Sequence, residues 1–391
     1  MALQEVPKIA KYLSVVMLFG FLGRNMVWNF LPVYFETHIQ SVFIIGILTS
    51  LPALVTLFMD IPVSNYIQRV GEKFVFFSGL IVGALPALMY IVATPVFLFA
   101  GKLTEGVTKS FIWNSGWSLS LKSSDEESES ESVSIFLLGV NLAAVIGPVI
   151  GGYLIMVHGF NLVFMLWFMT SVISVLVFVS YIGTSSKADR IQSFEQLFKS
   201  KTYRNDFKHL KEHWTDLRPV YILMFLFSII FGFFWLAVPL ALEELGASFV
   251  EMGLIFGLAA LPSVFQYIFG DIADKFGRIK TLLGLSLVLT PILLAMFYVQ
   301  SIVLLGVLFF FASAFTNGMS PAIHAMFDQV APEEVESELV GFLENFKHFG
   351  QLIGPIMAGS VASVFSLSVS FGFASAISGI IMVYSIALLR A

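Results

Sequence analysis

The chain has 391 residues, of which 58% are hydrophobic and only 12% are charged, and its mean hydropathy is +0.89. A water-soluble protein must cover its surface with polar side chains, so this composition excludes that class and indicates an integral membrane protein. The formal net charge of −5 points to no partner, and the absence of cysteine excludes disulfides, thiolate metal sites and cysteine nucleophiles.

Twelve apolar runs are long enough to cross a bilayer, which requires about 20 mostly apolar residues for each helix. The first run extends well beyond the short apolar core of a secretory signal and carries Arg24, so we expect it to be retained as a helix. The runs cover approximately residues 10–35, 42–66, 74–93, 96–120, 133–157, 161–183, 219–242, 249–270, 279–299, 302–325, 338–364 and 367–389. The sequence therefore predicts an all-α integral membrane protein.

The positions of the basic residues predict the orientation. If both termini lie in the cytoplasm, no lysine or arginine falls in a predicted outer loop. The outer loops instead carry Glu36, Glu243, Glu244 and Glu251. Because lysine and arginine accumulate in cytoplasmic loops, we expect a multi-pass protein of the cell membrane with both termini cytosolic.

Polar side chains interrupt the first and fourth runs. An ionised side chain near mid-bilayer costs about 2.5–3.5 kcal/mol on insertion scales, so these groups should line an interior cavity rather than face lipid. At 100° per residue, the fourth run places its bases, its acid and two tryptophans within an arc of about 120°. The predicted substrate-binding residues of this half are Arg24, Asn25, Trp28, Asn29, Lys109, Trp113 and Trp117.

Proton coupling in this half is predicted at three residues. Glu105 lies between Lys102 and Lys109, and burial would disfavour its charged form while the two ammonium groups would favour it. Asp60, toward the inner end of the second run, is a second candidate carboxylate. The alternative is a set of static ion pairs that hold the helices together, such as Arg24 with Asp60 or Glu105.

The second half carries less charge. The residues expected to contact substrate there are Trp235, Gln266 and Asn317. Glu344, Lys347 and His348 lie inside the eleventh run and favour an ion pair or an inner gate. His324 and His348 are isolated histidines without matching carboxylate spacing, so we expect hydrogen-bonded structural residues and no metal site.

One long connection and a repeat organise the chain. The polar, basic stretch 184–217 predicts a cytosolic linker between a six-helix bundle at 1–183 and another at 218–391. "GPVIGG" at 147–152 and "GQLIGPIMAG" at 350–359 place small residues four apart, with proline after a glycine, so we expect close helix packing at Gly147, Pro148, Gly151, Gly354 and Pro355. The two Gly-Pro pairs are separated by nearly the same length of chain as Gly71 and Gly277, which indicates a duplicated unit.

Two polar loops on the inner side stand out. "KSSDEESESES" at 122–132 predicts an ordinary solvated loop, with phosphorylation or cation sensing as the alternative. "GDIADKFGRIK" at 270–280 places carboxylates and bases together between two apolar runs. Its glycines permit a tight turn, its bases favour the anionic inner leaflet, and Asp274 can accept hydrogen bonds from a neighbouring helix N-terminus.

These motifs resemble those of a known family. Gly270, Asp274, Gly277 and Arg278, with the Gly-Pro pair of the fifth run, resemble the loop and antiporter signatures of the major facilitator superfamily. The first copy of the loop departs from the pattern, since Ser64 and Gln68 replace its glycine and aspartate. In the fourth run, Lys102 stands where the family often has an arginine.

The resemblance implies a fold and a mechanism. It implies twelve transmembrane helices in two pseudo-symmetric six-helix bundles, with Gly270, Asp274, Gly277 and Arg278 as a cytosolic latch. It implies a monomeric secondary transporter that moves a small organic solute by alternating access, most similar to the proton-coupled multidrug and small-molecule efflux antiporters. A proton gradient would then supply the energy without a bound cofactor.

Two alternatives to efflux stay open. Uptake or exchange of an organic anion is favoured by the surplus of bases at Arg24, Lys102 and Lys109 over the single acid Glu105. A sensor or lipid scramblase that does not transport is allowed by the departures in the first loop. The sequence offers no nucleophile with a base partner, no phosphate-cradling loop and no nucleic-acid signal, so an enzyme, ATP-driven transport and nucleic-acid binding are not expected.

Overall fold

The computed structural model describes residues 8–122, 129–184, 208–265, 267–332 and 334–390, and these residues form helices and no strand. Gln266, most of the predicted linker and most of the acidic loop at 122–132 lie outside these ranges. The first half contains α1 (Lys8–Asn25), the 3-10 helix η1 (Trp28–Phe30), α2 (Leu31–Glu36), α3 (Val42–Val70), α4 (Glu72–Val82), α5 (Leu85–Val92), α6 (Pro95–Leu121), α7 (Glu129–His158) and α8 (Phe160–Tyr181). The second half contains α11 (Trp214–Glu244), α12 (Phe249–Val264), α13 (Tyr267–Phe276), α14 (Arg278–Tyr298), α15 (Ile302–Val330), α16 (Glu336–Val364) and α17 (Leu367–Arg390).

Every predicted apolar run corresponds to one helix or to consecutive helices. Within the described ranges, nine helices are long and apolar enough to cross a membrane, or ten if the bent pair α12 and α13 forms one span. The other two runs are α6 and α16, which reach 27 and 29 residues but carry the polar residues singled out above. The all-α membrane class predicted from composition is confirmed, and apolarity by itself recovers fewer spans than the twelve predicted.

The first run is broken rather than continuous. Pro32 lacks the N–H that an α-helix would direct to the carbonyl oxygen of Trp28. The Leu31 N–H donates to that oxygen instead, which closes the tighter 3-10 turn η1 between α1 and α2. The break directly follows Arg24 and Asn25, so it lies beside the charged residue at the end of α1.

The chain divides into two compact units. The first comprises Met1–Leu31, Val55–Ser200 and Phe249–Gly257, and the second comprises Pro32–Leu54, Lys201–Ser248 and Leu258–Ala391. These units follow the two sequence halves except at residues 32–54 and 249–257, each of which packs with the other half.

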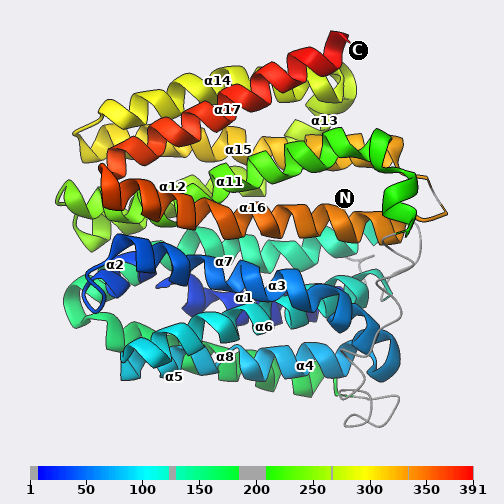
Figure 1. Cartoon of the computed structure of the whole chain (residues 1–391). Coiled ribbons are helices and arrows are strands. Elements are labelled where there is room, and N and C mark those ends of the chain that lie inside the picture. The colour runs from blue at the N-terminus through cyan, green and yellow to red at the C-terminus, as the bar shows by residue number, and fades with distance from the viewer. Residues whose placement is uncertain (1–7, 123–128, 185–207, 266, 333, 391) are drawn as a thin grey trace. The chain divides into compact units, whose positions relative to one another are not determined.

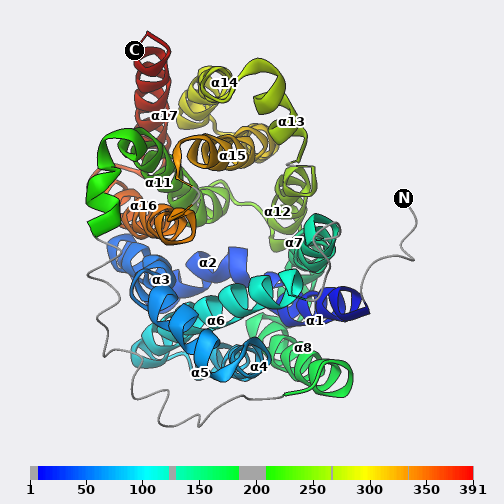
Figure 2. The same ribbon diagram turned by 90° about the vertical axis from the view of Figure 1, so that its right-hand side faces the viewer.

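In the first unit, α1 packs against α7 and α8, and α4, α5, α6 and α8 pack together (Figure 2). Gly139 and Gly147 face α1, and Gly151 faces the backbone of Met26 directly after it, so a β-carbon at any of the three would collide. On the α8 side of α1, the Ser174 hydroxyl donates to the Val16 carbonyl at 2.7 Å. Lipid supplies no hydrophobic drive between helices, so small residues and such hydrogen bonds provide the contact.

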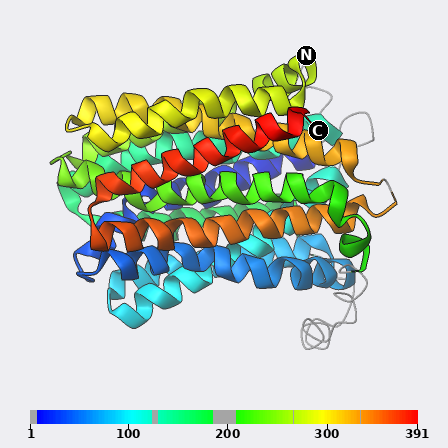
Figure 3. The same ribbon diagram turned by 45° about the horizontal axis from the view of Figure 1, so that its top comes forward.

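In the second unit, α11 runs along α16 and α14 runs along α17 (Figures 1 and 3). A β-carbon on Gly354 would lie 2.5 Å from the Ile229 carbonyl oxygen and 2.8 Å from Cα of Gly232, so Gly354 permits close approach of α11 and α16. The Thr290 hydroxyl of α14 lies 2.9 Å from the Ser378 hydroxyl of α17. The repeated glycine motif thus serves as a helix contact in both units.

The two exchanged segments make corresponding contacts. The start of α3 crosses α16 where Gly46 meets the Pro355 carbonyl oxygen and Gly359. The start of α12 crosses α7 where Gly253 meets the Pro148 carbonyl oxygen and Gly152. In repeat terms, the second helix of one half crosses the fifth helix of the other in both cases. Both crossings use glycine, because only a missing side chain lets two backbones approach so closely.

Candidate functional site

Charged side chains gather within both units, and one such cluster of the first unit centres on Glu105 of α6. Lys102 Nζ lies 3.1 Å from Glu105 Oε1, and Arg24 Nη2 from α1 lies 3.4 Å from Glu105 Oε2. The Tyr90 hydroxyl of α5 also donates to Glu105 Oε1. Three helices are therefore joined at a single carboxylate.

Tyr90 reaches Glu105 because α6 carries a glycine one turn earlier. A β-carbon on Gly101 would lie 2.5 Å from the Tyr90 ring, so the ring rests directly on the α6 backbone. Trp167 and Phe164 of α8 enclose its other side, with ring centroids 6.0 and 5.6 Å away. Tyr90 was not among the site residues predicted from the sequence. The four-residue spacing of Gly101 and Glu105 is the only signal in the sequence that would have suggested a partner there.

The electrostatics of this cluster favour ionised Glu105. Its side chain is only 2% exposed, and two cations and a hydroxyl donate to it, so protonation would leave Arg24 and buried Lys102 without their counter-charge. Arg24 and Lys102 together leave one surplus positive charge. Arg24 is the more accessible of the two cations, since its side chain is 25% exposed while that of Lys102 is 3% exposed.

Arg24 also lies between aromatic faces. Its guanidinium carbon is 5.7 Å from the centroid of Phe21 and 5.1 Å from that of Trp28. A partly exposed cation flanked by aromatic rings can contact an anionic group and an apolar or aromatic body of one ligand at the same time. The pair of Arg24 with Glu105, which the sequence analysis gave as the static alternative, is present.

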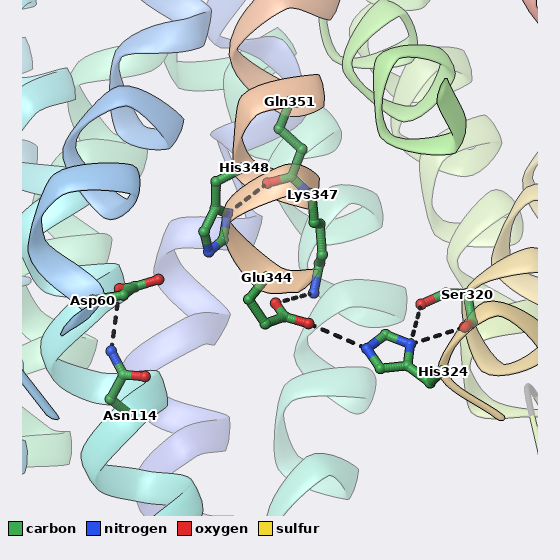
Figure 4. A network of polar contacts seen from close by, with 8 residues as sticks. All are labelled: Asp60, Asn114, Ser320, His324, Glu344, Lys347, His348 and Gln351. Atoms are coloured by element: carbon green, nitrogen blue, oxygen red, sulfur yellow. Dashed lines mark hydrogen bonds and ion pairs between the residues drawn. The ribbon is translucent and has the colours of Figure 1, made fainter. Parts of the chain in front are cut away.

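The other predicted residues of the first half are distributed over several environments. Asp60 of α3 accepts a hydrogen bond from the Asn114 amide at 3.1 Å (Figure 4). Asn25 is buried where α1 crosses Gly147. Trp113 packs between Phe21 and Phe136 in the apolar core of this unit, whereas Trp117 is exposed. Asn29 and Lys109 are half-buried, on η1 and α6.

The cluster of the second unit joins α15 and α16. Glu344 Oε2 lies 2.8 Å from Lys347 Nζ on the same helix, and Glu344 Oε1 lies 3.2 Å from Nε2 of His324 on α15 (Figure 4). His324 Nδ1 lies 2.9 Å from the Ser320 carbonyl oxygen. Buried His348 lies 3.4 Å from Gln351 one turn further along α16. The ion pair expected from the sequence is present, and its contact with His324 was not predicted.

The remaining candidates of the second half make local contacts. The Asn317 amide donates to the Ser313 carbonyl oxygen of its own helix at 2.9 Å. The Trp235 ring packs edge-on against Phe231, with centroids 5.3 Å apart. Gln266 lies outside the described residues. The structure thus places Asn317 on α15 and Trp235 on α11 of the second unit.

The proposed latch forms a turn at the start of α14. Gly277 has φ of 93° at the N-cap of α14, and Gly71 has φ of 94° at the N-cap of α4, so the same turn occurs in both halves. Exposed Asp274 lies 4.0 Å from Arg278. At Gly270 a β-carbon would meet open space. In the first copy, Glu72 pairs with Lys122 and Lys73 donates to the Ile182 carbonyl oxygen, which ties the start of α4 to the ends of α6 and α8.

Long apolar helices, glycine-mediated crossings and charges held inside the helix packing define a multi-pass membrane protein of the transporter type. The chain belongs to the Major Facilitator Superfamily, whose family model matches residues 13–258 and 220–391. Its members are transporters rather than enzymes, as the sequence analysis expected for this chain.

Relatives of known name match over most of the chain. It is 24% identical over 366 residues to the uncharacterized MFS-type transporter YuxJ of Bacillus subtilis, which covers 89% of this chain and 90% of YuxJ. It is 22% identical to multidrug resistance protein 2 of the same organism, over 94% of this chain and 91% of that protein.

Solved structures show the same fold at low identity. A bacterial homolog of the human lysosomal transporter Spinster superposes with a TM-score of 0.74 at 13% identity, over 98% of this chain and 96% of that one. The human organic anion transporter MFSD10 gives 0.67 at 14% identity, over 96% of this chain and 98% of that one. The predicted fold class is therefore confirmed.

Proposed function

We infer that this protein exports small aromatic or amphipathic solutes across the cell membrane in exchange for protons. The observation that carries this inference is similarity along nearly the whole chain to a relative named as a multidrug resistance protein. The Gly-Pro kink of α7 supports antiport, because it stands where the family's antiporter signature is expected. The energy source is the proton gradient, without a bound cofactor.

The orientation and state of assembly belong to the same proposal. The asymmetric placement of lysine and arginine supports cytosolic termini. We expect the monomer to be the transporting unit, with α13 and the turn at Gly277 as the cytosolic latch. In the first half, Arg24, Trp28 and Asn29 are the proposed substrate contacts, because they lie together where α1 ends.

Proton coupling in the first half is divided between its two carboxylates. The three donors around Glu105 support a constantly ionised anchor that positions Arg24 and Lys102. Asp60, which accepts the Asn114 amide, is then the proposed coupling carboxylate of this unit. This division assigns to Glu105 the static role that the sequence left as an alternative.

A second candidate function is uptake or exchange of an organic anion. The specific observation in its favour is the surplus positive charge beside Glu105, carried to the accessible side by Arg24. An anion that contacts this guanidinium would gain a charge-assisted hydrogen bond of about 1.5–3 kcal/mol.

Purified protein in vesicles tests both functions. Ethidium and carboxyfluorescein serve as cationic and anionic probes, and a pH dye reports proton movement. Export predicts ethidium movement that depends on an imposed pH gradient, with proton flow in the opposite direction. Carboxyfluorescein exchange without proton flow would favour the second candidate. If neither probe moves and no proton flow follows, the non-transporting sensor or scramblase is supported instead.

A further inference from the structure

We propose that His324 of α15 and Glu344 of α16 form a proton-binding site, and that this site carries an exchanged proton in the second unit as Asp60 does in the first. The proposal deepens the proposed function, since it names a group in the second unit that carries a coupled proton. It rests on the contacts made by the two ring nitrogens of His324 (Figure 4).

The contacts of Nδ1 in the His324 ring require a hydrogen on this nitrogen. This nitrogen lies 2.9 Å from the Ser320 carbonyl oxygen, which can only accept a hydrogen bond. A bare Nδ1 lone pair would repel that oxygen, so Nδ1 must carry the hydrogen. The Ser320 hydroxyl lies 3.5 Å from the same nitrogen, which makes it the weaker contact of the two.

On the opposite side of the ring, the contact between Nε2 and Glu344 requires a second proton. A neutral imidazole has one N–H, so with Nδ1 protonated Nε2 would present a lone pair to Glu344 Oε1 at 3.2 Å. Two acceptors would then face each other. The contact forms only if one further proton lies between them, either on Nε2 or on the carboxyl group. These two contacts are therefore satisfied together when the pair has bound one further proton.

The charges around the pair decide which of the two groups holds the second proton. Lys347 lies 2.8 Å from the other oxygen of Glu344 and favours the ionised carboxylate, so the proton belongs on the ring. His348 is the other titratable neighbour on α16, and it contacts Gln351. Loss of the proton changes a cluster of two cations and one anion into one balanced ion pair. Histidine is the side chain whose charge changes near neutral pH.

Access distinguishes this pair from the cluster at Glu105. The His324 and Glu344 side chains are each 34% exposed, whereas that of Glu105 is 2% exposed, so the pair is the less enclosed of the two clusters. Because the two residues belong to different helices, release of the proton removes a contact between α15 and α16. The site is thus able to convert proton binding into a change of helix contact.

The chain offers a matched control in His209. Its Nδ1 lies 2.5 Å from Oε2 of Glu338, which is also a histidine–glutamate contact with half-buried partners. Here the geometry requires only one ring proton, because neutral histidine with hydrogen on Nδ1 already donates to the carboxylate. His209 therefore needs no additional proton, and His209→Asn should leave coupling intact.

Nuclear magnetic resonance of the full chain, with nitrogen-15 in its histidines, tests the bound proton directly. The His324 signals are assigned by their loss in His324→Asn. Both His324 ring nitrogens should carry a proton in the wild-type chain, whereas only one should carry a proton in Glu344→Gln at the same pH. A singly protonated His324 ring in the wild-type chain, or a doubly protonated ring in Glu344→Gln, would overturn the proposal.

Transport in vesicles tests the exchange of that proton. His324→Asn and Glu344→Gln should lose gradient-driven ethidium accumulation at least tenfold while retaining ethidium counterflow, and His209→Asn should retain both. Gradient-driven accumulation at the wild-type rate in His324→Asn would overturn the role in exchange. If the wild-type chain moves no protons at all, the proposed function fails, whereas the resonance experiment still decides whether the pair binds a proton.

Discussion

Glu105 is the residue through which α1, α5 and α6 are joined, and its hydroxyl donor is the simplest to remove. Tyr90→Phe keeps the ring on Gly101 but deletes one hydrogen bond to a buried carboxylate. We expect a loss of about 1–3 kcal/mol of stability, measured as a lower midpoint of thermal unfolding in detergent. Tyr181→Phe is the control, because exposed Tyr181 makes a stacking contact with Tyr12 that survives the change. Equal midpoints for the two variants would contradict the role of Tyr90.

Arg24 separates the two substrate classes. Arg24→Gln removes the surplus charge but leaves Lys102 paired with Glu105, so the cluster stays balanced. If organic anions are transported, we expect carboxyfluorescein transport to fall at least tenfold, which corresponds to about 1.4 kcal/mol of lost interaction. Ethidium transport should be retained, because Trp28 and Asn29 remain as the contacts for an aromatic cation, which the guanidinium does not attract. Unchanged carboxyfluorescein transport in this variant would remove Arg24 from the anion site.

Among the elements, α16 allows a comparison of two glycines on one helix. Gly354 packs against Ile229 and Gly232 of α11, whereas a side chain at Gly341 would meet open space. Gly354→Ala should cost about 1–3 kcal/mol through overpacking. Gly341→Ala should be neutral or stabilising by up to about 1 kcal/mol, since alanine favours helix. Unfolding midpoints that move in the same direction would show that the crossing tolerates a methyl group.

The turn before α14 has a similar internal control. Gly277 has φ of 93°, a conformation that costs L-residues with a side chain about 1–2 kcal/mol. Gly277→Ala should therefore destabilise the protein and weaken the latch, whereas Gly270→Ala within α13 should not. Thermal unfolding and ethidium efflux measure the two effects. Full efflux and stability in Gly277→Ala would mean that the turn can re-form without positive φ.

At the scale of the whole molecule, the absence of cysteine makes orientation directly measurable. Ser301→Cys and Lys275→Cys place single thiols at exposed positions on either side of α14. With cytosolic termini, a membrane-impermeant maleimide should label position 301 in intact cells and position 275 only after permeabilisation. The reverse pattern would invert the proposed topology. The unchanged chain provides a background without thiols.

The sequence by itself determined the class of protein, because runs of about 20 apolar residues have few stable alternatives to a membrane helix. It also indicated the polar stripe of α6, since charges in such helices are too costly to face lipid. The glycine motifs on α7 and α16 could also be recognised from the sequence, because residues spaced four apart lie on one face of a helix. These predictions needed no knowledge of the partner helix.

Only the tertiary structure decided which partners those residues meet. Tyr90 lies one helix away from Glu105 in sequence, and His324 lies 20 residues from Glu344, so no helical periodicity links either pair. The exchange of residues 32–54 and 249–257 between units is likewise a matter of packing between distant segments. A local pattern fixes the face on which a side chain lies, whereas the protons and charges it shares depend on the helix that packs against that face.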